Sequence, residues 1–164
     1  MKPIVIAAGL LACFTTAAFA QDRMDNGLGY FQEFCLKPGG NLEKSIERLS
    51  NSDTFDNERY MGSDFTYVSY TGPDGINASV MINAPITDDK CTIMMAGVEE
   101  PMAQSEALAA TLTEAAGAEF MEWEAFDSYG DGGFGYRDAR GDIVVAPVAD
   151  GISQNILHLS FYPN

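Results

Sequence analysis

The chain has 164 residues and a formal net charge of −15, because 24 Asp and Glu residues outnumber 9 Lys and Arg residues. A surface with this excess of acid repels nucleic-acid phosphates and anionic lipid headgroups, so we expect no nucleic-acid partner. Hydrophobic residues make up 46% of the chain, which is too much for a disordered acidic tail and predicts a folded core.

The first twenty residues have the pattern of a secretory signal peptide. Lys2 supplies a positive charge, residues 4–14 are apolar, and small residues lead to Ala20 before the polar Gln21. We therefore predict cleavage after Ala20 and a periplasmic or secreted protein. Lipoprotein processing at Cys13 is the alternative. The apolar run is shorter than the roughly 20 residues that cross a bilayer, and no later run is longer, so we predict no membrane span.

Residues 21–164 have the length of a single domain that can bury its own core. Removal of residues 1–20 takes away Lys2 and no acid, so 8 basic residues remain against 24 acidic ones, a net charge of −16. The acids are scattered along the chain, which is typical of a solvated surface. Such a surface also suits a basic partner or a cation.

Three helices are predicted from apolar positions that recur every three or four residues. The first carries Leu28, Phe31, Phe34 and Cys35 on one face and ends at the breaker 37–40. The second follows a capping Asn41, and its stripe is Leu42, Ile46 and Leu49. The third begins at Pro101 and stops at Gly117, with an apolar face of Leu108, Leu112 and Ala116.

Seven strands are predicted where apolar and polar residues alternate between turn-forming residues. The clearest is 76–84, which follows the turn 71–75 and alternates Ile76, Ala78 and Val80 with polar residues. Residues 50–64 are polar and predict no regular element. The seven segments are 65–70, 76–84, 90–98, 118–126, 133–139, 142–148 and 154–162.

The resulting order is two helices, three strands, one helix and four strands. Strands joined by short turns pair antiparallel, so this order predicts an α+β domain with an antiparallel sheet, or sheets, of about seven strands. The helices are expected on one face. The second half repeats the helix-then-strands order of the first without similarity between individual residues.

Cys35 and Cys91 are the only cysteines after the predicted cleavage site. Export places them in an oxidising compartment, where an even number of cysteines favours a disulfide. Each lies on the apolar face of its element, so both point to one interior. Two cysteines and one distant His158 do not form a usual zinc set, and the spacing does not fit a thioredoxin-like redox pair. We therefore predict a structural disulfide, with Cys–His catalysis as a weaker alternative.

Residues 127–138, DSYGDGGFGYRD, form the candidate ligand loop. Its glycines favour a hairpin connection, while its aromatic and acidic side chains could face a ligand. A partial match to a calcium-binding EF-hand loop makes Ca²⁺ the alternative to a protein without cofactors. The candidate residues are Asp127, Tyr129, Asp131, Phe134, Tyr136 and Asp138.

Glu122 and Glu124 share one face of a predicted strand and could act as an acid–base pair, as in a small hydrolase. An exposed acidic strand is the more usual explanation, because glutamates are mostly exposed. The tripeptide 140–142 is Arg-Gly-Asp in an expected turn, and 77–79 matches a glycosylation sequon inside a predicted strand. Neither pattern is specific enough to define a function.

The stretches YFQEFC and KCTIMMAG, together with the signal segment, resemble small exported, periplasmic proteins of Gram-negative bacteria with two cysteines. The resemblance covers residues 1–98 and implies the compartment and the disulfide, but no activity. We therefore expect a non-enzymatic binding protein of the cell envelope, whose partner is another envelope protein or a small ligand. The alternatives are a carboxylate-dependent hydrolase and a calcium-stabilised domain.

Overall fold

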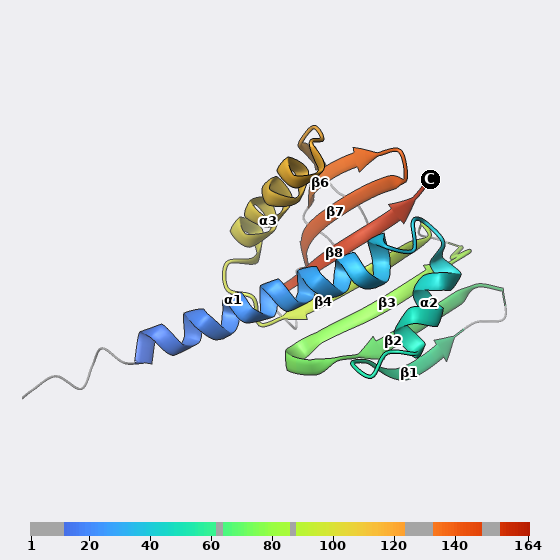
Figure 1. The fold of residues 1–164 in the computed structure, drawn as a ribbon, viewed down its shortest axis with the longest axis horizontal. Helices are drawn as coiled ribbons and strands as arrows, with labels where there is room; N and C mark the ends of the chain where they lie inside the picture. Colours follow the sequence, from blue (N-terminus) through green and yellow to red (C-terminus); the bar gives the residue numbers. More distant parts are fainter. Residues whose placement is uncertain (1–11, 62–63, 86–87, 124–132, 149–154) are drawn as a thin grey trace, which may run out of the picture.

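The structure is a computed structural model that describes residues 12–61, 64–85, 88–123, 133–148 and 155–164 (Figure 1). Its centre is one eight-stranded antiparallel sheet with the strand order β1-β2-β3-β4-β8-β7-β6-β5. The strands are β1 (Asp56–Met61), β2 (Thr66–Thr71), β3 (Ile76–Ile82), β4 (Lys90–Ala96), β5 (Met121–Trp123), β6 (Gly133–Asp138), β7 (Gly141–Val148) and β8 (Ile156–Pro163).

Three α-helices accompany the sheet: α1 (Ala12–Tyr30), α2 (Leu42–Ser50) and α3 (Pro101–Ala116). A π-helical segment, Phe31–Leu36, continues directly from α1. The predicted α+β class and the order of helices, strands, central helix and strands are confirmed. None of the described helices combines the length and the apolar character that crossing a bilayer requires.

Strand β1 lies in the segment for which the sequence predicted no regular element. It is an edge strand that pairs only with β2, and the register shifts between Asn57 and Arg59. A polar edge strand with a bulge has no alternating apolar pattern to reveal it, and charged residues at an edge discourage pairing with other chains. All seven predicted strand segments contain a strand of the sheet.

The sheet consists of two similar halves. Each half is a helical segment followed by a four-stranded meander, β1–β4 in the first half and β5–β8 in the second. The halves join where β4 pairs antiparallel with β8, so each meander extends outward from the centre. The repeated order noted in the sequence therefore corresponds to a repeated architecture.

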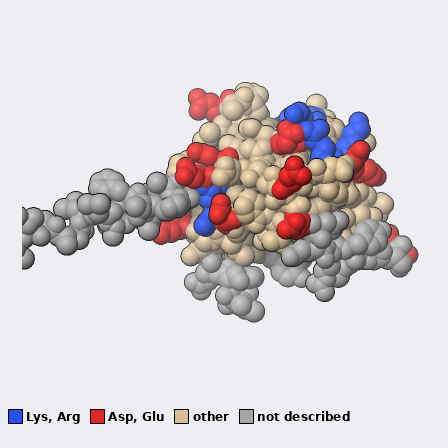
Figure 2. All heavy atoms as spheres, turned by 60° about the horizontal axis from the view of Figure 1, so that its bottom comes forward, with Lys and Arg blue, Asp and Glu red and all other residues tan. Residues whose placement is uncertain are grey.

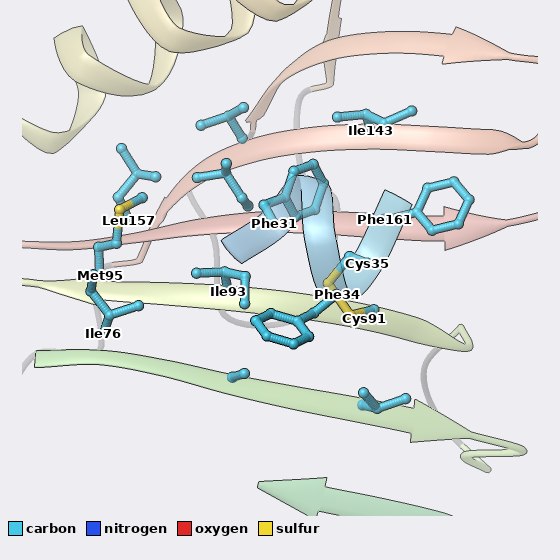
Figure 3. Close-up of a cluster of buried hydrophobic side chains, with 14 of the residues drawn as sticks. Phe31, Phe34, Cys35, Ile76, Cys91, Ile93, Met95, Ile143, Leu157 and Phe161 are labelled. Carbon is cyan, nitrogen blue, oxygen red and sulfur yellow. A yellow bond between two sulfur atoms is a disulfide. The ribbon is translucent and has the colours of Figure 1, made fainter. Parts of the chain in front are cut away.

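The helices cover one face of the sheet and bury the core against it (Figures 1 and 3). Phe31 and Phe34 point from the π-helical segment onto the central strands, where Ile93 and Leu159 are fully buried. The predicted apolar face of the first helix is thus confirmed, with Leu28 half-buried at its edge. A phenylalanine or leucine buried in this way contributes about 2–3 kcal/mol.

Helix α2 begins as predicted, because the side chain of Asn41 accepts a hydrogen bond from the backbone N–H of Lys44 at 2.8 Å. The phenol of Tyr70 on β2 ties this helix to the sheet. Its hydroxyl lies 3.0 Å from Ser50 Oγ and donates to the carbonyl of Ile46.

Helix α3 packs on β6 and β7 through a face that is shifted from the predicted one towards the start of the helix. Leu112 is buried as expected, but Ala116 is exposed. The buried stripe also contains Ser105 and Thr113, whose hydroxyls donate back to carbonyls one turn earlier, each at 2.7 Å. Small residues whose polar groups are satisfied within the helix allow a close approach to the sheet.

The described part of α1 after residue 20 is docked on β4. The Arg23 guanidinium donates to the carbonyl of Ala96 at 2.6 Å, and Gly27 lies so close to Met95 that a Cβ there would stand 2.2 Å from the sulfur. The chain is therefore anchored to the sheet from residue 23 onward. Figure 1 shows that the first turns of α1 project beyond the sheet.

Candidate functional site

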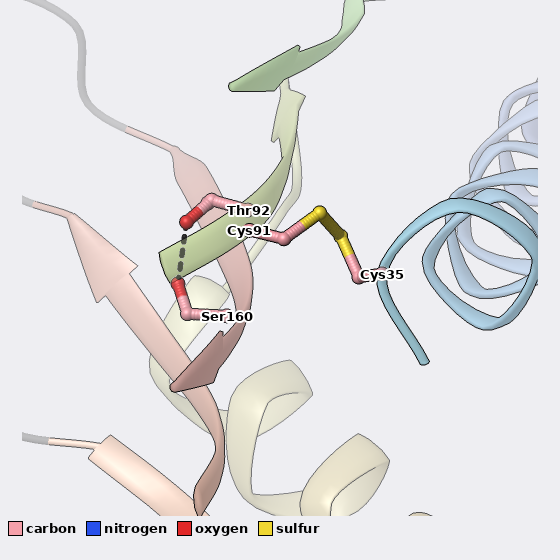
Figure 4. Close-up of a disulfide and its surroundings, with 4 residues drawn as sticks. All are labelled: Cys35, Cys91, Thr92 and Ser160. Atoms are coloured by element: carbon pink, nitrogen blue, oxygen red, sulfur yellow. Dashed lines mark hydrogen bonds between the residues drawn. A yellow bond between two sulfur atoms is a disulfide. The ribbon is translucent and has the colours of Figure 1, made fainter. Parts of the chain in front are cut away.

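The predicted disulfide between Cys35 and Cys91 is confirmed. The two Cα atoms are 5.4 Å apart, and both residues are fully buried between the π-helical segment and β4. Figure 4 shows the bridge on one side of β4, while the buried pair of Thr92 and Ser160 lies on the other side with hydroxyl oxygens 3.0 Å apart. A disulfide-bonded sulfur is no nucleophile, so these cysteines do not form a Cys–His pair with His158.

The candidate ligand loop is described only in part, because Asp127, Tyr129 and Asp131 lie outside the described residues. Phe134 and Tyr136 lie on β6, on the sheet face that packs against the helices. Burial raises the pKa of the Tyr136 phenol, and this side chain belongs to the core. The role of this stretch as a ligand loop stays a prediction.

Asp138 closes the turn between β6 and β7. Its carboxylate accepts hydrogen bonds from the backbone N–H of Arg140 at 2.7 Å and from the Arg140 guanidinium at 2.5 and 3.0 Å. The side-chain bond from Arg140 holds the pKa of Asp138 below its usual range. In the same hairpin, the Arg137 guanidinium forms a bidentate ion pair with Asp142. Its Nε donates to Oδ1 at 2.5 Å and its Nη2 to Oδ2 at 2.7 Å. Both charged residues of the Arg-Gly-Asp tripeptide therefore form ion pairs within the hairpin.

Of the predicted acid–base pair, Glu122 is exposed on the short edge strand β5, and Glu124 lies outside the described residues. Met121 and Trp123 of the same strand are half-buried. His158 lies half-buried on β8, on the sheet face opposite the helices. The catalytic hypothesis for the two glutamates stays untested.

An open hollow of about 650 Å³ lies at one end of the sheet, which we call the end-of-sheet hollow. It is bounded by the start of α2, the end of β3 and the residues after it, the start of β7 and the end of β8. In Figure 1 this is the end at which the C-terminus lies. Its apolar lining is made by Leu42, Ile82, Tyr162 and Pro163.

Four carboxylates line the same hollow, and none of its described lining residues is basic. Glu43 and Asp88 are exposed, whereas Asp142 is held by Arg137 and Asp89 accepts the backbone N–H of Asn83 at 2.6 Å. The hydrogen bonds of Asp89 and Asp142 thus help to fix the shape of the hollow. The hollow therefore combines a few apolar side chains with four carboxylates in a lining that is mostly polar.

The backbone at this end requires glycine at one position. Gly141 has a φ of 151°, and a Cβ built on it would lie 1.9 Å from the carbonyl oxygen of Tyr162. This close approach lets β7 begin directly beside the end of β8, which brings Asp142 and Tyr162 into the lining of one hollow. A side chain at this position would separate them.

No sequence pattern points to the end-of-sheet hollow, because its lining comes from four segments far apart in the chain. Asp88 and Asp89 lie between the predicted strands 76–84 and 90–98, and Asp142 ends an Arg-Gly-Asp tripeptide. Only the antiparallel order of β3, β4, β8 and β7 brings these segments to the same end of the sheet.

Basic side chains also lie beside this site, because Arg137 pairs with Asp142 and the Lys90 ammonium lies 5.4 Å from the centre of the Tyr162 ring. Figure 2 shows acidic side chains spread singly over one side of the molecule, with basic side chains gathered mainly at one end. Lys37 and Arg48 both form ion pairs with the carboxylate of Glu33. The Lys37 Nζ lies 2.8 Å from Glu33 Oε2, and Arg48 reaches the same carboxylate from α2. These two hydrogen bonds, from Lys37 first and Arg48 second, hold the pKa of Glu33 below its usual range.

Comparison with known proteins returns no relative: no protein family, curated protein or solved structure matches the chain.

Proposed function

We propose that the protein is an exported component of the cell envelope that binds a basic segment of a partner protein at the end-of-sheet hollow. The observation that carries the binding role is the hollow itself, in which a few apolar side chains and four carboxylates come together from separate elements. A basic segment with one apolar side chain complements both features. The net charge of −16 after removal of residues 1–20 attracts such a segment over a longer range.

Two observations support export. The buried Cys35–Cys91 disulfide is the kind of bond that persists in oxidising compartments. Arg23, three residues beyond the predicted cleavage site, is the first described side chain that bonds to the sheet. Cleavage after Ala20 would therefore remove α1 only up to the point where it becomes part of the domain.

A carboxylate-dependent hydrolase is the second candidate, favoured by the convergence of Glu43, Asp88 and Asp142 in one hollow. A catalytic pair usually contains one carboxyl group withdrawn from water, which can then act as an acid. Glu43 and Asp88 are both exposed, and Asp142 is already paired with Arg137. This arrangement favours binding over acid–base catalysis.

Titration with a short peptide of lysine and leucine tests the binding role. The double variant Glu43→Gln/Asp88→Asn removes two negative charges from the hollow and should weaken binding about five- to thirtyfold, because charge pairs at such a rim are worth roughly 0.5–1 kcal/mol each. The matched control Glu106→Gln/Glu114→Gln removes two exposed charges from α3 and should leave binding nearly unchanged. Equal weakening by both variants would show that only the overall charge matters and would overturn the site.

A further inference from the structure

The residue that would begin the mature chain, Gln21, is exposed at the end of the docked part of α1. Its side-chain amide donates to the carboxylate of Asp25 at 2.9 Å, one helical turn further on. Arg23 is held on the carbonyl of Ala96. The two residues before this anchor, Gln21 and Asp22, are both exposed, so the new amino end would lie in solvent.

There is also room around this end of the helix. A hollow of about 220 Å³ lies beside it and is lined by Gln21 together with Arg23, Gly97, Glu99 and Gln104. A glutamine in such an open position can fold its side chain back toward its own amino nitrogen. The single exposed hydrogen bond to Asp25 must open first, which costs about 1 kcal/mol.

We propose that Gln21 of the exported protein is converted to pyroglutamate, an inference that rests on the cleavage after Ala20 in the proposed function. The α-amino nitrogen attacks the side-chain carbonyl carbon Cδ and forms a new C–N bond. The bond from Cδ to Nε2 breaks, and Nε2 leaves as ammonia with a proton from the attacking amine. The product is a five-membered lactam, and the reaction needs no oxidant, reductant or second substrate.

The modification suits the electrostatics of this helix end. A free amino terminus would place a positive charge at the start of a helix, where the helix dipole is already positive. The lactam is neutral and removes that charge. Asp22 and Asp25, in the first turn of the shortened helix, then stabilise the remaining N–H groups.

Intact mass measurement of the protein isolated from the periplasm of a bacterium that expresses the full chain tests the proposal. We expect the mass of residues 21–164, with the disulfide formed, reduced by the mass of one ammonia molecule. Pyroglutamyl aminopeptidase should then remove exactly the first residue. The control Gln21→Ala has no side-chain carbonyl that the amino nitrogen could attack, so its mass should show no loss of ammonia.

A second variant tests the part that depends on the structure. Asp25→Ala releases the side chain of Gln21, so the fraction converted after a fixed time should rise severalfold. If the mature protein shows no loss of the mass of ammonia after prolonged incubation, the proposed pyroglutamate is overturned, while the proposed export is not. A first residue other than 21, or the mass of the whole chain 1–164, would overturn both the modification and the predicted cleavage.

Discussion

Replacing both disulfide cysteines, Cys35→Ala/Cys91→Ala, should destabilise the protein strongly without changing its fold. The bridge is the covalent link between the π-helical segment and β4, and it joins residues 56 positions apart. Without it, Phe31 and Phe34 must hold the segment on the sheet by apolar packing alone. We expect these two buried rings to keep the segment docked in the folded state.

The size of the effect follows from the loop that the bridge closes. In the chain-entropy treatment, a loop of this length restricts the unfolded chain by about 4 kcal/mol. For a domain of this size, that loss corresponds to a decrease in the melting temperature of about 8 to 16 °C. Urea unfolding followed by the fluorescence of Trp123, with a parallel thermal scan, measures both quantities.

Reduction provides the matched control for this experiment. Dithiothreitol should lower the stability of the wild-type protein to about that of the double variant, and it should leave the double variant unchanged. If the double variant unfolds within about 1 kcal/mol of the oxidised wild type, the bridge does not restrict the unfolded chain as proposed, and the argument from loop length fails.

Three further predictions concern residues around the core. Gly141→Ala should lower the free energy of unfolding in urea by about 2–4 kcal/mol, because its Cβ would lie 1.9 Å from a backbone carbonyl oxygen. The control Gly39→Ala is also at positive φ but in open space, and should cost about 1 kcal/mol. Similar losses for the two variants would contradict the close approach at Gly141. Glu33→Gln should lower the urea midpoint at neutral pH. The difference in midpoint from the wild type should shrink as the pH falls below about 4.3, because a carboxyl group whose pKa is lowered in the folded state stabilises that state only while it is ionised. A difference in midpoint that does not change with pH would refute this role. Thr92→Val should lower the free energy of unfolding by about 1–2 kcal/mol, because it leaves the buried hydroxyl of Ser160 without its partner. Adding Ser160→Ala should restore part of that loss. A double variant that is less stable than either single variant would contradict the pairing.

The sequence was sufficient for those parts of the fold that follow from local patterns. The three- and four-residue spacing of Phe31, Phe34 and Cys35 predicted a buried helical face, and the structure confirms it. The cysteine count and the two apolar faces predicted the disulfide. Asn41 and Gly117 predicted the start of α2 and the end of α3 because capping depends on a single residue.

Other parts of the fold depend on tertiary contacts and leave no local pattern. Strand β1 pairs along one edge only, so its residues need not alternate. The buried face of α3 follows from where the helix meets β6 and β7, and hydroxyls such as that of Thr113 can be buried because they bond within the helix. The hydrophobic stripe alone therefore pointed to Ala116, which is exposed.

The candidate site was the least predictable feature. The loop 127–138 attracted attention because its glycine, acidic and aromatic residues are close in sequence. The end-of-sheet hollow instead joins Glu43, Asp88 and Asp142, and their proximity depends on the strand order and on the lack of a side chain at Gly141. Long-range strand pairing of this kind cannot be read from one sequence by local rules.

Photocrosslinking in the native envelope tests the binding role most directly. A photoreactive amino acid at Ala84, in the lining of the hollow, should capture one partner through a basic segment identified by mass spectrometry. The adduct should disappear when Glu43→Gln/Asp88→Asn is added, and the same probe at the exposed Ala110 of α3 should not give it. An adduct pattern that is the same at both positions, or that survives the loss of the two carboxylates, would contradict a binding site at this end of the sheet.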